Sequence, residues 1–213
     1  MSEKPFLTVA KETQHENIIK KSRFICSIKK VTSEEEAQNF VNQIKEENRK
    51  ATHNCFAYMV GDTDQIQRES DNGEPSGTAG VPILESIKLA NLHNTCAVVT
   101  RYFGGIKLGA GGLIRAYSNV TTDAIQDAGV ARRIKQTAVE ITVSYADHDQ
   151  LIYYLKQKDL QIASEDYGVD VKTWIFVNND QVDNLTQELT NSFNGQLIIN
   201  KGDQRDNEAP YKG

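Results

Sequence analysis

The sequence predicts an α+β protein of two domains, and three observations carry this prediction. Of the 213 residues, 38% are hydrophobic and 25% are charged, which is typical of a globular protein with an ordinary core. Strand patterns and helix patterns alternate along the whole chain without a low-complexity linker. Residues 136–200 follow the order strand-helix-strand-strand-helix-strand, which is the ferredoxin-like arrangement. We therefore expect a first domain over residues 1–133, a ferredoxin-like domain over 134–202 and a polar, frayed tail over 203–213.

The first domain is expected to open with strands followed by a helix. Residues 6–10 and 17–31 carry β-branched and aromatic side chains at short spacing, which favours strands. Ser33 is a good N-cap, and Glu36 three residues later completes a capping box, so a helix is expected to begin here. Residues 53–60 have the pattern of the next strand. The helix would bury a stripe made of Ala37, Phe40, Val41 and Ile44.

Two glycine-rich segments follow, with a helix and a strand between them. The first, DNGEPSGTAGVPI, covers residues 71–83 and is dense in turn residues, so it is expected to be a loop. A short helix over 83–91 and a buried strand over 96–101 come next. The second segment, YFGGIKLGAGGLIRAYS, begins at residue 102 and opens a helix that ends at Gly129. That helix would bury Leu113, Tyr117, Val120, Ala124 and Ala128.

The second domain is expected to contain four strands and two helices. Asp147 would cap the first helix, and the second would begin at Asp180 and stop at Gly195. The segment over 169–177 alternates apolar and polar side chains, as a strand with one buried face does. The strands are expected at 136–144, 160–166, 169–177 and 196–200, and the helices would bury Leu151, Tyr154, Leu155, Val182, Leu185, Leu189 and Phe193.

Charge is distributed unevenly along the chain. The formal net charge is −5, which argues against a surface that is basic throughout. The 37 residues from Ser86 to Thr122 nevertheless contain no aspartate or glutamate, so a local positive field is expected there. The second glycine-rich segment also opens a helix, and free N–H groups at a helix N-terminus attract phosphate. The four basic residues of this stretch are Lys88, Arg101, Lys107 and Arg115.

These features predict a surface that binds phosphate or nucleic acid. Arg101, Lys107 and Arg115 would contact phosphates, while Tyr102 and Phe103 would stack on bases. The segment is neither a Walker A loop nor a dinucleotide fingerprint, because the required spacing of glycine, lysine and hydroxyl residues is absent. The alternative is that the glycines only permit tight turns and that the arginines are solvated. The residues assigned to this surface are Arg101, Tyr102, Phe103, Gly104, Gly105, Lys107, Gly109, Gly111, Gly112 and Arg115.

The first glycine-rich loop offers other chemistry. Asp71 and Glu74 could hold Mg²⁺ or serve in acid–base catalysis, or they could only cap backbone N–H groups of the loop. Ser76 and Thr78 are expected to stabilise the turn or contact phosphate, since the nucleophile elbow of serine hydrolases is absent. The loop is expected to meet the second glycine-rich segment and to form one binding surface with it. Its signature residues are Asp71, Gly73, Glu74, Pro75, Ser76, Gly77 and Thr78.

The remaining reactive side chains do not predict a catalytic set. His53 and Cys55 lie two apart in an expected strand and so share a face, which core packing explains more simply than a nucleophile does. Cys26, Cys55 and Cys96 are odd in number and widely spaced, so neither a disulfide framework nor a CxxC zinc site is expected. The chain shows no signal peptide and no membrane-length apolar run. We expect a cytoplasmic protein with no cofactor, no metal and no catalytic residue.

Two long motifs resemble one known family. RESDNGEPSGTAGVPIL, at residues 68–84, and VVTRYFGGIKLGAGGLIRAYS, at 98–118, closely resemble the signature of the YigZ/Impact family. KKSRFI and ATHNCFAY, earlier in the chain, resemble its other landmarks. The likeness covers residues 16–130, and residues 136–200 are similar to the small second domain of the bacterial members. One departure is Asn72, where members often carry a second aspartate that a two-carboxylate metal site would need.

The resemblance implies a fold and a cellular role. The first domain would be similar to domain IV of elongation factor G (EF-G) and its ribosomal relatives, with a left-handed βαβ connection, and the second to EF-G domain V. Both relatives touch RNA or the ribosome, so the implied function is translation regulation through nucleic-acid or ribosome binding. Eukaryotic members restrain a starvation-responsive kinase of translation initiation through an additional N-terminal domain. That activity is not expected here, because this chain begins directly with the shared domain.

Two other functions remain open at this point. One is a phosphate- or nucleotide-handling enzyme with a metal at the Asp71 and Glu74 loop. The other is a module that docks a translation factor through the same loops. We expect no membrane partner, and the first function, binding of RNA or the ribosome, is the one that the basic stretch favours.

Overall fold

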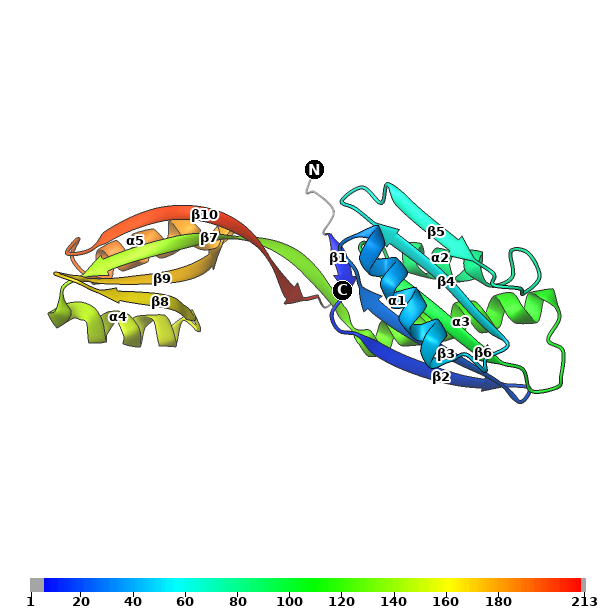
Figure 1. Ribbon diagram of the computed structural model, residues 1–213. Coiled ribbons are helices and arrows are strands. Elements are labelled where there is room, and N and C mark those ends of the chain that lie inside the picture. Colours follow the sequence, from blue (N-terminus) through cyan, green and yellow to red (C-terminus); the bar gives the residue numbers. More distant parts are fainter. Residues whose placement is uncertain (1–5, 212–213) are drawn as a thin grey trace. The chain divides into compact units, whose positions relative to one another are not determined.

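The computed structural model describes residues 6–211 and contains, among them, two sheets and five α-helices, so the fold is α+β as predicted (Figure 1). The chain divides into two compact units. Unit 1 extends to Arg133 and takes in the chain again from Ala209, and unit 2 is Ile134–Glu208. Among the described residues, no helix combines the length and the apolarity needed to cross a membrane.

Unit 1 is built on a sheet of five antiparallel strands. The order across this sheet is β2-β3-β6-β4-β5. Neighbouring strands pair antiparallel throughout, so β3 and β4, which both pair with β6, run in the same direction. The strands are β2 (Thr13–Ile19), β3 (Ser22–Lys30), β4 (His53–Val60), β5 (Ile66–Ser70) and β6 (Thr95–Tyr102).

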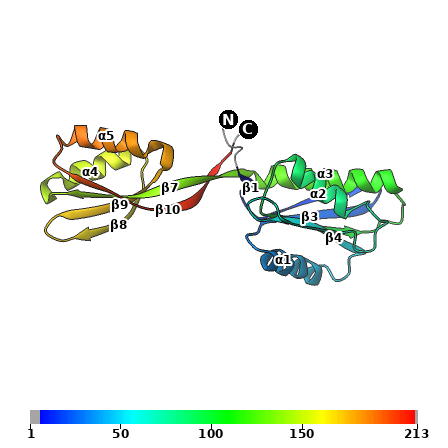
Figure 2. The same ribbon diagram turned by 90° about the horizontal axis from the view of Figure 1, so that it is seen from above.

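Three helices cover the two faces of this sheet. Figure 2 shows α1 (Glu34–Glu47) on one face and α2 (Gly80–Leu89) and α3 (Ala110–Ala128) on the other. Ser33 caps α1 as predicted, because its hydroxyl accepts a hydrogen bond from the Glu36 N–H at 3.1 Å. The α2 helix begins earlier than the predicted residue 83, since a side chain far back in the loop caps its N-terminus, as described below.

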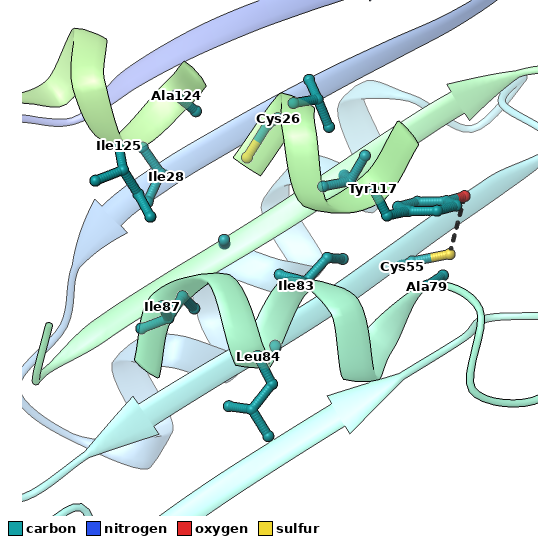
Figure 3. Close-up of a cluster of buried hydrophobic side chains, with 14 of the residues drawn as sticks. Cys26, Ile28, Cys55, Ala79, Ile83, Leu84, Ile87, Tyr117, Ala124 and Ile125 are labelled. Carbon is teal, nitrogen blue, oxygen red and sulfur yellow. Dashed lines mark hydrogen bonds between the residues drawn. The ribbon is translucent and has the colours of Figure 1, made fainter. Parts of the chain in front are cut away.

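Each face of the sheet has its own hydrophobic core. Successive strand residues point to opposite faces, so Cys96 and Val98 of β6 pack with α1, while Ala97 and Val99 pack with α2 and α3. Figure 3 shows the second of these cores, in which Tyr117 of α3 lies among aliphatic side chains from α2 and the strands. The predicted apolar stripe of α3 is buried throughout.

In unit 1, one strand prediction was wrong and one strand was missed. The segment 17–31 is a hairpin, because the chain turns at Lys20 and Lys21, whose φ angles are 47° and 65°. Glycine and asparagine normally signal such a turn, and here two lysines occupy it. The β5 strand was not predicted at all. It lies at the sheet edge with mostly exposed side chains, so it has no alternation of apolar and polar residues to detect.

Unit 2 has the predicted order of strands and helices. Its sheet runs β8-β9-β7, with β10 also paired to β7, and a core of aliphatic side chains from both helices covers one face. The first residues of β7 pair antiparallel with β1 (Leu7–Val9) within unit 1, which is why β7 begins before the predicted residue 136. The elements are β7 (Val130–Val143), α4 (Tyr145–Gln157), β8 (Ile162–Tyr167), β9 (Val171–Asn178), a 3₁₀ turn (Asn179–Gln181), α5 (Val182–Ser192) and β10 (Ile198–Pro210).

Two details of this part of the chain differ from the predictions. Ser144, and not Asp147, is the N-cap of α4; its hydroxyl accepts from the Asp147 N–H. Residues 203–210 of the expected frayed tail are instead the second half of β10, and the Tyr211 N–H donates to the Val130 carbonyl at 2.8 Å; residues 212–213 of that tail lie outside the described part of the chain. Strand pairing uses backbone groups and needs no apolar side chains, so a polar sequence gave no sign of it.

Candidate functional site

The two glycine-rich loops meet in unit 1, as predicted, and a pocket of about 410 Å³ lies where they meet. One wall comes from the first loop and from the start of β4, and the other comes from the end of β6 and the start of α3. Its lining residues are Thr52, His53, Glu74, Pro75, Arg101, Phe103, Lys107, Leu108, Gly109, Ala110 and Leu113.

Asp71 organises the first loop by capping α2. Its carboxylate accepts hydrogen bonds from the N–H groups of Gly77 at 2.8 Å, Ala79 at 2.9 Å and Gly80 at 2.9 Å. The N-cap residue itself, Ala79, has no side chain able to do this. Burial acts to raise the pKa of the Asp71 carboxyl, but the three N–H groups outweigh it and hold the pKa below its usual value. The capping interpretation is therefore correct for Asp71.

The rest of the first loop is shaped by backbone turns. Gly73 and Gly77 have φ angles of 88° and 74°, a region that side chains with a Cβ atom rarely occupy. Asn72 also has a positive φ, and its side-chain oxygen accepts from the Asn54 N–H at 2.8 Å. The Thr78 hydroxyl donates to the Pro75 carbonyl at 2.6 Å, so Thr78 stabilises the turn. Ser76 is exposed.

Glu74 is buried and forms an ion pair with Arg101. The Arg101 Nη1 atom lies 2.6 Å from the Glu74 Oε1 atom, and only 4% of the Glu74 side chain and 6% of the Arg101 side chain are exposed. The Tyr117 hydroxyl donates to the same Glu74 oxygen at 2.9 Å. Burying two charges is costly unless they are paired and hydrogen-bonded. Glu74 and Arg101 are paired with each other, and Glu74 is also hydrogen-bonded to Tyr117. Arg101, predicted as a phosphate ligand, is thus already neutralised by Glu74, although the residue lines the pocket.

Behind this ion pair the network continues to Cys55. The Cys55 thiol donates to the Asp71 carbonyl at 2.9 Å and lies 3.4 Å from the Tyr117 hydroxyl oxygen, a contact drawn in Figure 3. Burial raises the pKa of Cys55 to about 12, so the thiol stays protonated at neutral pH. A thiolate is the reactive form of cysteine, and Cys55 is therefore a structural residue.

His53 is positioned at the pocket wall by a backbone carbonyl. Its Nδ1 atom lies 2.9 Å from the Asn72 carbonyl oxygen, so Nδ1 carries the proton and donates it. The Nε2 atom is left to face the carboxylate of Glu74, with 3.9 Å between Nε2 and Oε2. The predictions considered His53 only as a partner of Cys55. The landmark ATHNCFAY contains His53 and was the one signal that could have placed it here.

The second loop supplies the cationic wall. Lys107 is exposed, and Gly109, with a φ of 73°, is the N-cap of α3 without any side chain to occupy the first N–H groups of the helix. Phe103 is 46% exposed, and its ring lies over the Arg101 guanidinium at 5.4 Å. Tyr102 lies elsewhere; its hydroxyl donates to Asn48 at 2.9 Å and it does not line the pocket.

The positive field is smaller than the sequence predicts. Arg101 is paired with Glu74, and Lys88 is paired with Glu85 one turn away on α2. Within residues 6–211, Lys107 and Arg115 form no ion pair. Arg115 is exposed on α3 and lies outside the pocket lining. The pocket therefore offers one unpaired lysine and one helix N-terminus, and not a broad basic surface.

The fold and this pocket define a class: a two-unit α+β protein whose first unit carries paired glycine-rich loops. Residues 20–125 match the family described as Impact N-terminal domain, and residues 141–196 match a domain of unknown function, DUF1949. The chain belongs to the IMPACT family, a conclusion that two similar proteins support.

The chain is 41% identical to the IMPACT family member YvyE of Bacillus subtilis (strain 168), over 93% of this chain and 91% of that protein. It is 33% identical to the IMPACT family member YigZ of Escherichia coli (strain K12), over 85% of this chain and 90% of that protein. A solved structure titled "Crystal structure of an hypothetical protein" is also similar, with a TM-score of 0.59 and 32% identity, over 91% of this chain and 95% of that one.

Proposed function

We propose that the chain is a cytoplasmic regulatory protein linked to translation, which binds RNA or a ribosomal surface through the pocket of unit 1. The observation that carries this proposal is the meeting of the two glycine-rich loops in one pocket with an unpaired lysine, an exposed phenyl ring and an open helix N-terminus. Phosphate binds to lysine and to helix N–H groups, and bases stack on aromatic side chains. The pocket combines both kinds of contact.

The fold analogies support the same proposal. In unit 2 the strand order β10-β7-β9-β8 is that of a ferredoxin-like sheet, so we assign unit 2 to the class of EF-G domain V. In unit 1 the parallel strands β3 and β4 are joined through α1, which suits the βαβ connection of EF-G domain IV, where it is left-handed. Both analogues act on the ribosome, which agrees with the proposed function.

The charge of unit 2 favours unit 1 as the binding unit. An acidic surface repels phosphates. Residues 136–200 contain ten acidic residues and only three lysines, Lys156, Lys158 and Lys172. The acidic residues are Glu140, Asp147, Asp149, Asp159, Glu165, Asp166, Asp170, Asp180, Asp183 and Glu188.

The enzyme alternative is less well supported by the contacts of the first loop. The oxygens of Asp71 accept three backbone N–H groups, and Glu74 is held by Arg101 and Tyr117. A metal at these two carboxylates would compete with those donors for the carboxylate oxygens. Within residues 6–211 no group of three or more histidine, cysteine, aspartate or glutamate side chains is placed to hold a metal ion.

Co-sedimentation with ribosomes at low salt tests the proposal. The full chain is expected to pellet with ribosomes and to be released as the salt concentration rises, because salt weakens binding to phosphates. A parallel pull-down from nuclease-treated lysate separates the docking alternative, in which a translation factor is still captured without nucleic acid. If the chain bound neither ribosomes nor any RNA fraction at low salt, the proposal would be wrong.

A further inference from the structure

We infer that the pocket of unit 1 is a site for one nucleotide, held by a terminal phosphate monoester and by its base. This inference rests on the proposed function and deepens it by naming the group that enters the pocket. The phosphate would lie between Lys107, Arg101 and the first N–H groups of α3, and the base would lie against Phe103 and the apolar wall. A free mononucleotide and the phosphorylated end of an RNA chain share this chemistry.

Arg101, a residue of the pocket wall, carries a buried donor without a partner. Within residues 6–211, the Arg101 Nε atom is the one buried side-chain nitrogen or oxygen without a hydrogen-bond partner. Its guanidinium donates through Nη1 to Glu74, and its Nη2 atom lies 3.5 Å from the Ser22 hydroxyl. A buried donor without a partner is unfavourable, so an acceptor supplied by a ligand would be favoured here. Phosphate oxygens are such acceptors.

The second argument is the open end of a long helix beside that donor. The α3 helix has 19 residues, and its N-cap Gly109 offers no side-chain acceptor. Its first N–H groups, at Ala110 and the residues after it, therefore have no capping partner, and Ala110 lines the pocket. The partial positive charge of a helix N-terminus attracts anions. Lys107 stands two residues before this N-cap and lines the same pocket.

The third argument is charge balance, which sets the number of anionic groups. Glu74 and Arg101 neutralise each other, so the remaining positive charge comes from Lys107 and the partial charge of the helix end. This suits one phosphate group and does not suit a long row of phosphates. A volume of about 410 Å³ falls in the range of small-ligand sites, about 300–1,000 Å³.

The fourth argument is the apolar part of the wall. Pro75, Phe103, Leu108 and Leu113 line the pocket together with the charged groups. Phe103 is nearly half exposed although it is aromatic, and a base can stack favourably on such a ring. Inorganic phosphate would leave this wall uncovered, and a nucleoside would leave the Arg101 Nε atom and the helix end unused. A nucleotide uses both.

Isothermal titration calorimetry on the full chain tests the inference. The probes are the four nucleoside 5′-monophosphates, the same nucleosides and inorganic phosphate, all at low salt. At least one monophosphate is expected to bind about tenfold or more tightly than its nucleoside and than inorganic phosphate. Lys107→Gln is expected to weaken that binding, and Phe103→Leu is expected to weaken it without changing binding of inorganic phosphate. Lys11→Gln, at an exposed lysine between β1 and β2, is the charge-matched control and should bind as the native chain does.

Short RNA oligonucleotides with and without a terminal phosphate identify the source of the nucleotide. Tighter binding of the phosphorylated oligonucleotide assigns the site to RNA ends, and binding of mononucleotides alone assigns it to the free ligand; either result supports the inference. Equal affinity for nucleoside and nucleotide, or no binding of any nucleotide, overturns it. Ribosome co-sedimentation would then still test the proposed function separately. If the chain bound nucleotides but did not bind ribosomes or RNA, the nucleotide site would stand and the proposed function would be wrong.

Discussion

Glu74 is a carboxylate with almost no access to water, and its stability depends on two donors, Arg101 and Tyr117. Glu74→Ala removes one partner of a buried ion pair and leaves the Arg101 charge uncompensated. We expect the free energy of unfolding of unit 1 to fall by about 3–5 kcal/mol. Amide hydrogen exchange of unit 1 residues, measured as the urea concentration rises, gives this free energy of unfolding. Tryptophan fluorescence would not, because the single tryptophan, Trp174, lies in unit 2.

The matched control for this prediction is the exposed ion pair on α2. Glu85 and Lys88 lie 3.1 Å apart with 53% and 37% of their side chains exposed, so Glu85→Ala should cost about 1 kcal/mol or less. Replacing both buried charges, as in Glu74→Leu with Arg101→Met, should cost less than Glu74→Ala alone. A destabilisation by Glu74→Ala no larger than that by Glu85→Ala would contradict the role given to the buried pair.

Substitution by alanine is expected to have opposite effects on stability at Gly104 and at Gly111. A Cβ atom on Gly104 would lie 2.0 Å from the Lys21 carbonyl carbon, while a Cβ on Gly111 would meet no atom within 4 Å. Gly104→Ala should therefore destabilise unit 1 by about 1–3 kcal/mol through overpacking. Gly111→Ala, in the first turn of α3, should be neutral or stabilising by up to about 1 kcal/mol. Thermal unfolding of both variants measures whether each change raises or lowers stability. Equal changes in stability would contradict the close packing of Gly104 against Lys21.

At the scale of the helix, Asp71 shows how a residue eight positions before Ala79 can fix where α2 begins. The three N–H groups that it accepts hold its pKa below the usual 3.8, although burial acts to raise it. The stabilisation is thus present above pH 3.8 and disappears as the pH falls through the lower pKa of the folded state. Asp71→Asn should reduce stability by about 0.5–2 kcal/mol at pH 7, and the difference from the native chain should shrink at acid pH.

Urea denaturation between pH 7 and pH 2 measures this convergence. Glu35→Gln is the control, because Glu35 is an exposed acidic residue in the first turn of α1. A charge near a helix N-terminus without a capping bond contributes about 0.3–1 kcal/mol, so this variant should change stability less than Asp71→Asn at pH 7. If the difference between the native chain and Asp71→Asn grew as the pH fell, the capping account would fail.

Elements with local signals could be predicted from the sequence, and those that depend on distant partners could not. The start of α1 follows from Ser33, and the end of α3 follows from Gly129, whose φ of 67° needs a glycine. The turn at Lys20 and the edge strand β5 carry no such signal. At the site, the meeting of the loops was predictable from the motifs. The pairing of Arg101 with Glu74, 27 residues earlier in the sequence, was not, because the sequence does not show which cation finds a buried partner.

For the whole molecule, we propose that anion binding belongs to the pocket of unit 1. The acidic composition of unit 2 opposes phosphate binding there. Because Arg101 is buried and paired, the informative cation of the pocket is Lys107, which forms no ion pair within residues 6–211. Lys201 of unit 2, which pairs with Asp183 on the surface, provides the comparison.

Filter binding of labelled RNA to the full chain, at salt concentrations from about 50 to 200 mM, tests this claim most directly. The native chain should bind less tightly as salt rises. Lys107→Gln should bind more weakly at low salt and flatten the salt slope by about one unit, because one lysine no longer neutralises a phosphate. Lys201→Gln should leave both quantities unchanged. An absence of binding at about 50 mM salt, or a larger decrease in affinity with Lys201→Gln than with Lys107→Gln, would contradict the assignment of binding to the pocket of unit 1.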